Sequence, residues 1–193
     1  MTKYILAGGF VNKSKDGGRA FYEEFVKGID NKPVKILDCI FARPVEVWEE
    51  TFKSDQNLLS QFIKDFTLEL ANPEEFTEQV KNSDVIFLRG GHTQQLFRLL
   101  NQDTAWMNEL DGKVLAGTSA GAEVIAKYYH VISSARTGDG FGLLSVKVIP
   151  HWKSKDFDEI PKNFDFDKAL SELKEYKEDL PIYTLAEGEF VVL

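Results

Sequence analysis

Short apolar segments recur along the chain, each bounded by turn residues, and longer stretches with apolar residues at helical spacing lie between them. A short apolar run suits a buried strand, and the stretch that follows it is long enough for a crossover helix. Alternating strands and helices predict an α/β fold with a mainly parallel sheet. We expect strands at Lys3–Ala7, Lys35–Ile40, Val85–Leu88, Lys113–Gly117, Val146–Ile149, Ile182–Leu185 and Phe190–Leu193.

The stretches between these strands carry the expected helices. One begins near Pro73, because Asn72 can cap a helix and proline fits the first helical turn. The segment Lys153–Phe166 is charged and aromatic and contains a proline, so it predicts a surface loop instead. Helices are expected at Arg19–Ile29, in part of Glu46–Leu70, and at Pro73–Lys81, Thr93–Asn101, Ala120–Tyr129 and Phe166–Lys177.

The length and charge of the chain limit the class of protein. With 193 residues it fits one domain, residues 1–193, that is long enough to bury a core. The net charge is -8 and the 23 basic residues are scattered, which argues against a nucleic-acid partner or an anionic membrane surface. No apolar run approaches the roughly 18 residues of a membrane span, and the N-terminal run is too short for a signal peptide. We therefore expect a cytoplasmic protein.

Cys39 is the single cysteine of the chain, so it cannot form an intramolecular disulfide. Its neighbours in the stretch Val34–Phe41 are mostly apolar. A buried, unreactive thiol is therefore expected here rather than a catalytic one.

The segment Val114–Ala126 predicts the chemistry of the chain. A buried strand leads into the Gly-x-Ser-x-Gly motif around Ser119, and a helical pattern follows. In this context the motif is typical of a nucleophile elbow, where small residues let the chain reverse and expose the serine hydroxyl. The N-terminus of the following helix would point at the site and help to hold an oxyanion. The structural alternative is that Gly117 and Gly121 serve close packing and that Ser119 only caps the helix.

A serine nucleophile needs a base, and the chain offers three histidines, His92, His130 and His151. His151 follows an expected strand, and a parallel sheet would deliver it to the edge that also carries Ser119. His92 also follows a strand, but it lies in a glycine turn that is better suited to presenting backbone N–H groups. His130 is expected at the C-terminus of the helix after Ser119, where the helix dipole gives it a structural role. His151 is therefore the leading base.

A second glycine segment, Gly90 and Gly91, lies between the strand Val85–Leu88 and a helix. Its backbone N–H groups could form the other half of an oxyanion hole, although an ordinary strand-to-helix turn has the same pattern. Phosphate binding is less favoured, because the glycines of this chain lack the Gly-x-x-x-x-Gly-Lys and Gly-x-Gly-x-x-Gly spacings.

Taken in order, these motifs resemble the peptidase E (dipeptidase E) and cyanophycinase family of serine peptidases over nearly the whole chain. The resemblance implies a three-layer α/β sandwich with a mainly parallel sheet, similar to class I glutamine amidotransferases, with serine in place of cysteine at the elbow. The matching segments are Ala7-Gly8-Gly9, Gly90-Gly91-His92-Thr93, Gly117-Thr118-Ser119-Ala120-Gly121-Ala122, Gly142-Leu143-Leu144, Pro150-His151-Trp152 and Leu185-Ala186-Glu187-Gly188.

The resemblance also implies roles for individual residues and a substrate. Ser119 would be the nucleophile and His151 the general base, and the N–H groups of Gly91 and Ala120 would bind the oxyanion. The expected partner is a short peptide, with an N-terminal aspartate suggested by the family, and neither a metal nor a cofactor is implied. His92 stands where the family usually has asparagine, which would alter substrate contacts and leave the backbone donors intact. Residues expected against the substrate are Gly90, His92, Thr93 and Glu123.

The carboxylate that orients the base is a second departure from the family pattern. Peptidase E places an aspartate after the elbow helix, where this chain has Tyr128–Ser134 without a carboxylate. Glu187 matches an acid placed late in the cyanophycinase-like branch and is expected to orient His151, with Asp139 as the alternative. The order Ser119, His151, Glu187 also differs from α/β-hydrolases, in which the acid precedes the histidine.

Two other functions are compatible with the sequence. One is a non-catalytic module of the same fold that binds a small molecule or a peptide, and the other is an esterase or amidase with the same three residues. An acidic substrate side chain would want a cation, for which Arg89, Arg136 and Lys153 are candidates. The Lys153–Phe166 loop follows His151 and is placed to cover the cleft as a lid. We expect a monomer or a homodimer.

Overall fold

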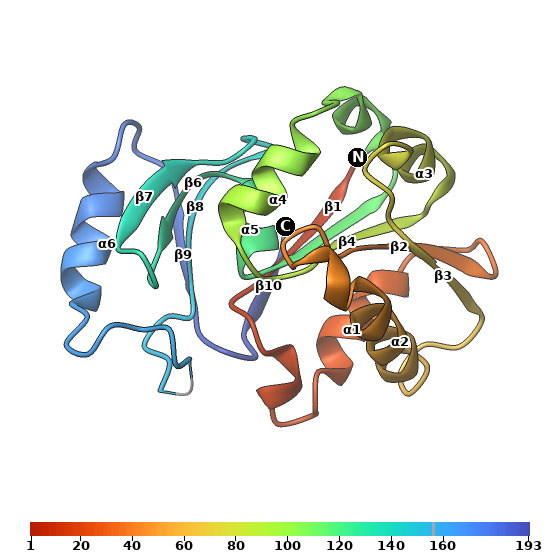
Figure 1. The fold of residues 1–193 in the computed structure, drawn as a ribbon, viewed down its shortest axis with the longest axis horizontal. Helices are drawn as coiled ribbons and strands as arrows, with labels where there is room; N and C mark the ends of the chain where they lie inside the picture. Colours follow the sequence, from red (N-terminus) through yellow and green to blue (C-terminus); the bar gives the residue numbers. More distant parts are fainter. Residues whose placement is uncertain (156) are drawn as a thin grey trace.

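One sheet collects the strands of the first part of the chain together with the last strand (Figure 1). The computed structural model describes residues 1–155 and 157–193, and in it six strands follow the order β10-β1-β5-β4-β2-β3. Strands β1 to β5 run parallel, whereas β10 pairs antiparallel with β1. Their bounds are β1 Lys3–Ala7, β2 Val34–Cys39, β3 Phe66–Leu70, β4 Val85–Leu88, β5 Val114–Thr118 and β10 Phe190–Val192.

Helices cover both faces of this sheet, because successive side chains of a strand point to opposite faces. On one face, Ile5 and Phe87 pack in the cluster that includes residues of α1 and α2. On the other face, Leu6 and Leu88 pack with residues of α3, α4 and α5. The predicted three-layer α/β sandwich is therefore confirmed. The helices are α1 Arg19–Val26, α2 Trp48–Leu59, α3 Phe76–Asn82, α4 Thr93–Leu100 and α5 Ala120–Ile125.

A second, four-stranded sheet of order β7-β6-β8-β9 lies beside the first (Figure 1). Strands β6, β8 and β9 are parallel, and β7 is antiparallel to β6. Ile149 packs against Leu173 of α6 on one face, while Val148 packs into the cluster around α5 on the other, so α5 contacts both sheets. The bounds are β6 Ala126–Val131, β7 Arg136–Asp139, β8 Leu144–Pro150, β9 Ile182–Leu185 and α6 Phe166–Glu175.

Short 3-10 helices lie in the connections, at Val11–Lys13, Val45–Val47 and Ala105–Glu109. Cys39 is a free thiol with no exposed surface, as expected from the sequence. Within residues 1–155 and 157–193, no helix is both long enough and apolar enough to cross a lipid bilayer.

The chain after Ser119 differs from the prediction. The helix expected to reach Tyr129 ends at Ile125, and the chain continues directly as β6. Burial alternates along β6, with His130 among the buried residues, and this period of two together with the paired tyrosines is typical of a strand. His130 therefore lies in a strand, and the helix-terminus role predicted for it was wrong.

Three smaller differences concern element boundaries. The segment Glu46–Leu70 contains α2 followed by β3, a strand that the prediction did not separate from the helix. The third helix starts at Phe76 rather than Pro73, because the Asn72 side chain accepts a hydrogen bond from the Glu74 N–H at 3.0 Å within a turn. Strand β7 was not predicted. The other predicted helices and strands agree with the structure to within a few residues at their ends.

Candidate active site

Ser119 lies at the turn between β5 and α5, in a backbone conformation that non-glycine residues rarely adopt. Its φ is 51° and its ψ is -114°, and its N–H donates to the carbonyl of Ala7 at 2.9 Å. Only glycine fits at the two flanking positions. A Cβ on Gly117 would lie 2.4 Å from the Gly121 carbonyl carbon, and a Cβ on Gly121 would lie 2.1 Å from the Leu88 oxygen. The strained serine and its small neighbours are the features of a nucleophile elbow.

His151 lies immediately after β8 and contacts the serine. The ring nitrogen Nε2 of His151 is 2.9 Å from Ser119 Oγ. The backbone N–H of His151 donates to the Gly8 carbonyl at 3.0 Å. Gly9 leaves the space that the imidazole needs, since a Cβ there would be 2.4 Å from His151 Cε1. Burial lowers the pKa of His151 below its ordinary value, although the neighbouring Glu187 carboxylate acts in the opposite direction. The neutral imidazole, which can accept a proton, is therefore favoured.

Glu187 follows β9 and faces the other nitrogen of the ring. Its Oε1 is 3.3 Å from His151 Nδ1 and accepts a hydrogen bond from Ser154 Oγ at 2.5 Å. Lys13 Nζ lies 3.4 Å from Oε2 of the same carboxylate. Glu187 is thus held on three sides, and the geometry allows it to orient the imidazole.

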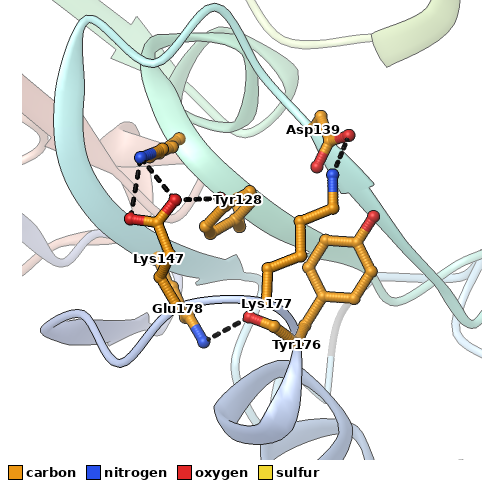
Figure 2. Close-up of polar contacts among 7 residues, drawn as sticks. Tyr128, Asp139, Lys147, Tyr176, Lys177 and Glu178 are labelled. Carbon is orange, nitrogen blue, oxygen red and sulfur yellow. Dashed lines mark hydrogen bonds and ion pairs between the residues drawn. The ribbon is translucent and has the colours of Figure 1, made fainter.

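The alternative acid, Asp139, lies elsewhere. It is at the end of β7, where Lys177 Nζ contacts its carboxylate at 2.6 Å (Figure 2). The structure therefore brings Glu187, and not Asp139, to His151.

The β4–α4 loop presents Gly91 beside the elbow. Gly91 has a φ of 152°, and a Cβ there would lie 2.4 Å from the Ala42 oxygen, so glycine is needed for this close approach. The neighbouring N–H groups are already used: Gly90 N–H donates to Thr118 Oγ1 at 3.1 Å, and His92 N–H donates to the Ala42 carbonyl at 2.7 Å. The hydrogen bonds of the described residues leave the N–H of Gly91 without a backbone acceptor.

Ala120 is the first residue of α5, so its N–H has no partner within the helix. Together with Gly91 it could hold an oxyanion. Thr93 and Glu123 lie close by, and the Thr93 hydroxyl donates a hydrogen bond to the Glu123 carboxyl. Burial raises the pKa of Glu123 to about 7. His92 is exposed at the edge of the cleft.

The cleft has two arms that meet at Ser119 and His151. The first arm has a volume of ≈ 500 Å³, and its lining includes Arg43, Asp55 and Arg89. The second has a volume of ≈ 680 Å³, and its lining includes Glu123, Tyr129 and Arg136. Residues common to both arms are Gly91, His92, Ser119, His151, Phe157 and Glu159.

The loop after His151 lines the cleft through Phe157 and Glu159. The Phe157 ring stacks on the imidazole of His151 with ring centroids 4.0 Å apart, and Phe10 contacts the same imidazole edge-on at 5.7 Å. The loop expected to cover the cleft therefore contacts the proposed base directly. Residue 156 of that loop lies outside the described residues.

Three residues considered from the sequence, His130, His92 and Lys153, take no part in the described hydrogen bonds of Ser119. His130 is buried, with its Nδ1 3.0 Å from Thr137 Oγ1, and it lines neither arm. His92 lines both arms without contacting Ser119 through any described hydrogen bond. Lys153 lies over the Trp152 ring and is not among the residues that line the arms.

The sequence named Arg89 and Arg136 as candidate cations, and they line the first and the second arm respectively, but the groups around Arg89 were missed. Arg89 Nε lies 3.0 Å from Asp55 Oδ2, and both side chains are largely buried. Burial and the nearby Asp55 raise the pKa of Asp38 well above its ordinary value. Arg43 could have been found, because it closely follows the carboxyl end of a parallel strand, but Asp55 comes from the middle of α2 and gives no such signal.

The fold and the cleft define an α/β sandwich with a serine at a strand-to-helix turn, a histidine in contact with it and a carboxylate behind the histidine. The sequence matches peptidase family S51 over residues 44–193. The chain belongs to this family of serine peptidases.

Solved structures agree on the fold. A candidate peptidase E protein from Listeria monocytogenes EGD-e superposes with a TM-score of 0.72 at 20% identity, covering 100% of this chain and 94% of that one. A peptidase from an acI-B1 Actinobacterium has a TM-score of 0.72 at 23% identity, covering 100% of this chain and 83% of that one. No curated protein matches the sequence significantly.

Proposed function

We propose that this chain hydrolyses short peptides through an acyl-enzyme formed on Ser119. The observation that carries the proposal is the 2.9 Å contact between His151 Nε2 and Ser119 Oγ, made by a serine held at positive φ. A serine that only caps α5 would use its hydroxyl to accept from the helix N–H groups, and no such bond is described for Ser119. The geometry therefore favours a nucleophile over a cap.

The proposed reaction is acyl transfer. Ser119 Oγ attacks the carbonyl carbon of the scissile bond while its proton passes to His151 Nε2, and Glu187 keeps the other nitrogen protonated. The carbonyl oxygen gains negative charge and is bound by the N–H groups of Gly91 and Ala120. His151 then gives its proton to the leaving amine. Water attacks the acyl-enzyme by the same route and releases Ser119.

The size and charge of the cleft support short, acidic substrates. Arms of ≈ 500 and ≈ 680 Å³ are within the usual range of small-ligand sites. The first arm holds two guanidinium groups, Arg43 and Arg89, and two carboxyl groups, Asp55 and Glu159. Arg89 Nε is paired with Asp55 at 3.0 Å, whereas the Arg43 guanidinium donates to the Gly90 carbonyl at 3.3 Å and to the Thr51 hydroxyl at 3.5 Å. A guanidinium such as that of Arg43, which makes no ion pair with a carboxylate among the described residues, suits a substrate carboxylate. We therefore propose that peptides with an N-terminal aspartate are preferred, with Arg43 as a contact.

The proposal is tested by the hydrolysis of Asp-Leu and Ala-Leu dipeptides by the wild type, Ser119→Ala and Arg43→Gln. We expect the wild type to prefer Asp-Leu by about tenfold or more, as for one charge-assisted contact, and Arg43→Gln to reduce this preference. Ser119→Ala should hydrolyse neither dipeptide. Equal turnover of the two dipeptides would remove the aspartate preference. Hydrolysis that survives in Ser119→Ala would contradict the peptidase mechanism.

A further inference from the structure

The two proposed oxyanion donors come from separate loops. The N–H of Gly91 belongs to the β4–α4 loop, and the N–H of Ala120 belongs to the β5–α5 turn. An oxyanion hole stabilises a transition state only when both donors lie at hydrogen-bond distance from the same oxygen. The distance between these N–H groups therefore depends on the contacts that join the two loops.

Two hydrogen bonds join these loops, one on each side of the donors. On one side the Gly90 N–H donates to Thr118 Oγ1 at 3.1 Å. On the other side the Thr93 hydroxyl donates to the carboxyl of Glu123. In the sequence, each donor lies between the two anchored residues of its own loop. The pair of cross-links thus brackets both donors.

The side chains of both cross-links are buried. Thr118 is 5% exposed, Thr93 8% and Glu123 4%, so water competes little for their hydrogen bonds. Burying a carboxyl group costs free energy that burying an apolar side chain would not. The burial of Glu123 also raises its pKa to about 7. A carboxyl kept at this position on the first turn of α5 is explained if its hydrogen bond to Thr93 is needed.

We propose that Thr93, Glu123 and Thr118 are positioning residues that fix the separation of the two oxyanion donors. The inference rests on the proposed function, because it assigns these side chains to stabilisation of the transition state. Thr93 and Glu123 thus act through Gly91 and Ala120, and not, as the sequence suggested, chiefly by binding substrate.

The test uses Thr93→Val and Thr118→Val, which remove one hydroxyl each from side chains of similar shape. We expect kcat to fall about 10-fold to 100-fold in each variant while KM changes less than about threefold, because the lost alignment is felt in the transition state. A peptide aldehyde, which forms a tetrahedral adduct with Ser119, should lose affinity by a similar factor. Thr93→Ser, which keeps the hydroxyl, should recover most of the lost kcat.

Ser83→Ala provides a matched control for the loss of a buried hydroxyl. The Ser83 hydroxyl donates to the Gln79 carbonyl at 2.7 Å at the end of α3, outside the lining of either arm. This variant should lower Tm with an unchanged kcat. A merely structural role for Thr93 and Thr118 would give the same result, so Tm is measured for every variant.

The outcomes separate this inference from the proposed function. Valine variants that lose Tm but keep the wild-type kcat would overturn the inference and leave the peptidase intact. A raised KM with unchanged kcat would also overturn it, since the threonines would then bind substrate. A folded wild type that hydrolyses no short peptide would overturn the proposed function, and the inference with it.

Discussion

Ser119 and His151 share a backbone feature that explains their alignment. Both have positive φ, 51° and 55°, a conformation that costs roughly 1–3 kcal/mol for a non-glycine residue. Each is held there by a hydrogen bond from its N–H to the end of β1, to Ala7 and Gly8 respectively. A Cβ on Gly8 would also lie 2.2 Å from the Ala186 oxygen, next to Glu187. The end of β1 therefore positions all three side chains of the candidate site.

The identity of the acid is tested by comparing Glu187→Gln with Asp139→Asn. We expect Glu187→Gln to lower kcat by about 10²-fold to 10⁴-fold, because an amide cannot hold the imidazole and its charge as the carboxylate does. Asp139→Asn should change kcat less than about twofold, since its carboxylate pairs with Lys177 and not with His151. Steady-state kinetics on one dipeptide decides between them. The reverse pattern would assign the role to Asp139.

The pH dependence of activity follows from the burial of His151. Burial lowers its pKa below the ordinary 6.5, and a general base works only in its neutral form. The value of kcat/KM should therefore rise with pH, reach half its maximum below pH 6.5 and be lost at lower pH. Glu123, with a pKa of about 7, titrates nearby, so Glu123→Gln is measured in parallel. A half-maximum above pH 7.5 in both proteins would contradict this assignment.

The sequence best predicted the positions of the candidate residues that follow strands. Ser119, His151 and Glu187 all follow predicted strands. The single sheet edge expected for Ser119 and His151 was wrong, because Ser119 follows β5 of the first sheet, whereas His151 and Glu187 follow β8 and β9 of the second, and the packing of the two sheets brings them together. Phe157 and Asp55 were not found, because their contacts with the site depend on how a long loop and α2 pack over the sheet. Local sequence patterns hold no information on such packing.

At the scale of elements, α6 is fastened to the strand that carries His151. Lys147 lies on β8 with no exposed surface, and its ammonium donates to the carbonyls of Leu173, Lys174 and Tyr176 at 2.8, 3.0 and 2.8 Å. These carbonyls lie at the end of α6, where helical partners are missing. Figure 2 draws Lys147 with Tyr176, whose carbonyl accepts one of these bonds, beside the contact between Tyr128 and Glu178. The lysine therefore acts as a cap contributed by another element.

Replacing Lys147 by methionine should destabilise the protein. Methionine fills a similar volume but leaves the three carbonyls without their donor, and an unsatisfied buried acceptor costs about 1–3 kcal/mol. We expect the free energy of unfolding, measured by urea denaturation, to fall by about 2 kcal/mol, with kcat per folded molecule reduced by less than about threefold. A variant as stable as the wild type would show that the cap is dispensable.

Errors in predicting elements have a common physical cause. The segment after Ile125 was expected to continue a helix, yet Ala126–Val131 forms a strand in which buried and partly exposed side chains alternate. This alternation arises because the strand packs within the second sheet. Strand β7, Arg136–Asp139, is short, polar and at a sheet edge, so it has no apolar signal. Both strands owe their formation to packing against neighbouring strands rather than to a local apolar pattern, which makes them hard to predict.

At the scale of the whole molecule, one apolar cluster joins the two sheets. It contains Leu37 and Leu115 of the first sheet, Val124 of α5, and Val146 and Val148 of the second. Breaking either sheet would expose the side chains that the other needs. We therefore expect residues 1–193 to unfold as one unit, as predicted from the length of the chain.

Cys39 gives a direct test of this cooperativity. Its thiol has no exposed surface, lies in the shared cluster, and burial raises its pKa. A thiol reagent should therefore react with Cys39 only when the protein unfolds. Plotted against denaturant concentration, the extent of this reaction should follow a single transition that coincides with the loss of circular dichroism. Reaction in native buffer at the rate of a free thiol, or two separate transitions, would show that the sheets unfold independently.

The central claim is an activated serine at position 119. The most direct test is fluorophosphonate labelling of the wild type beside Ser119→Ala and His151→Ala, with the labelled peptide identified by mass spectrometry. The account predicts labelling at Ser119 in the wild type and its loss in both variants, because the 2.9 Å contact with His151 is what activates the hydroxyl. A folded wild type that is not labelled, or labelling that persists without His151, would contradict it.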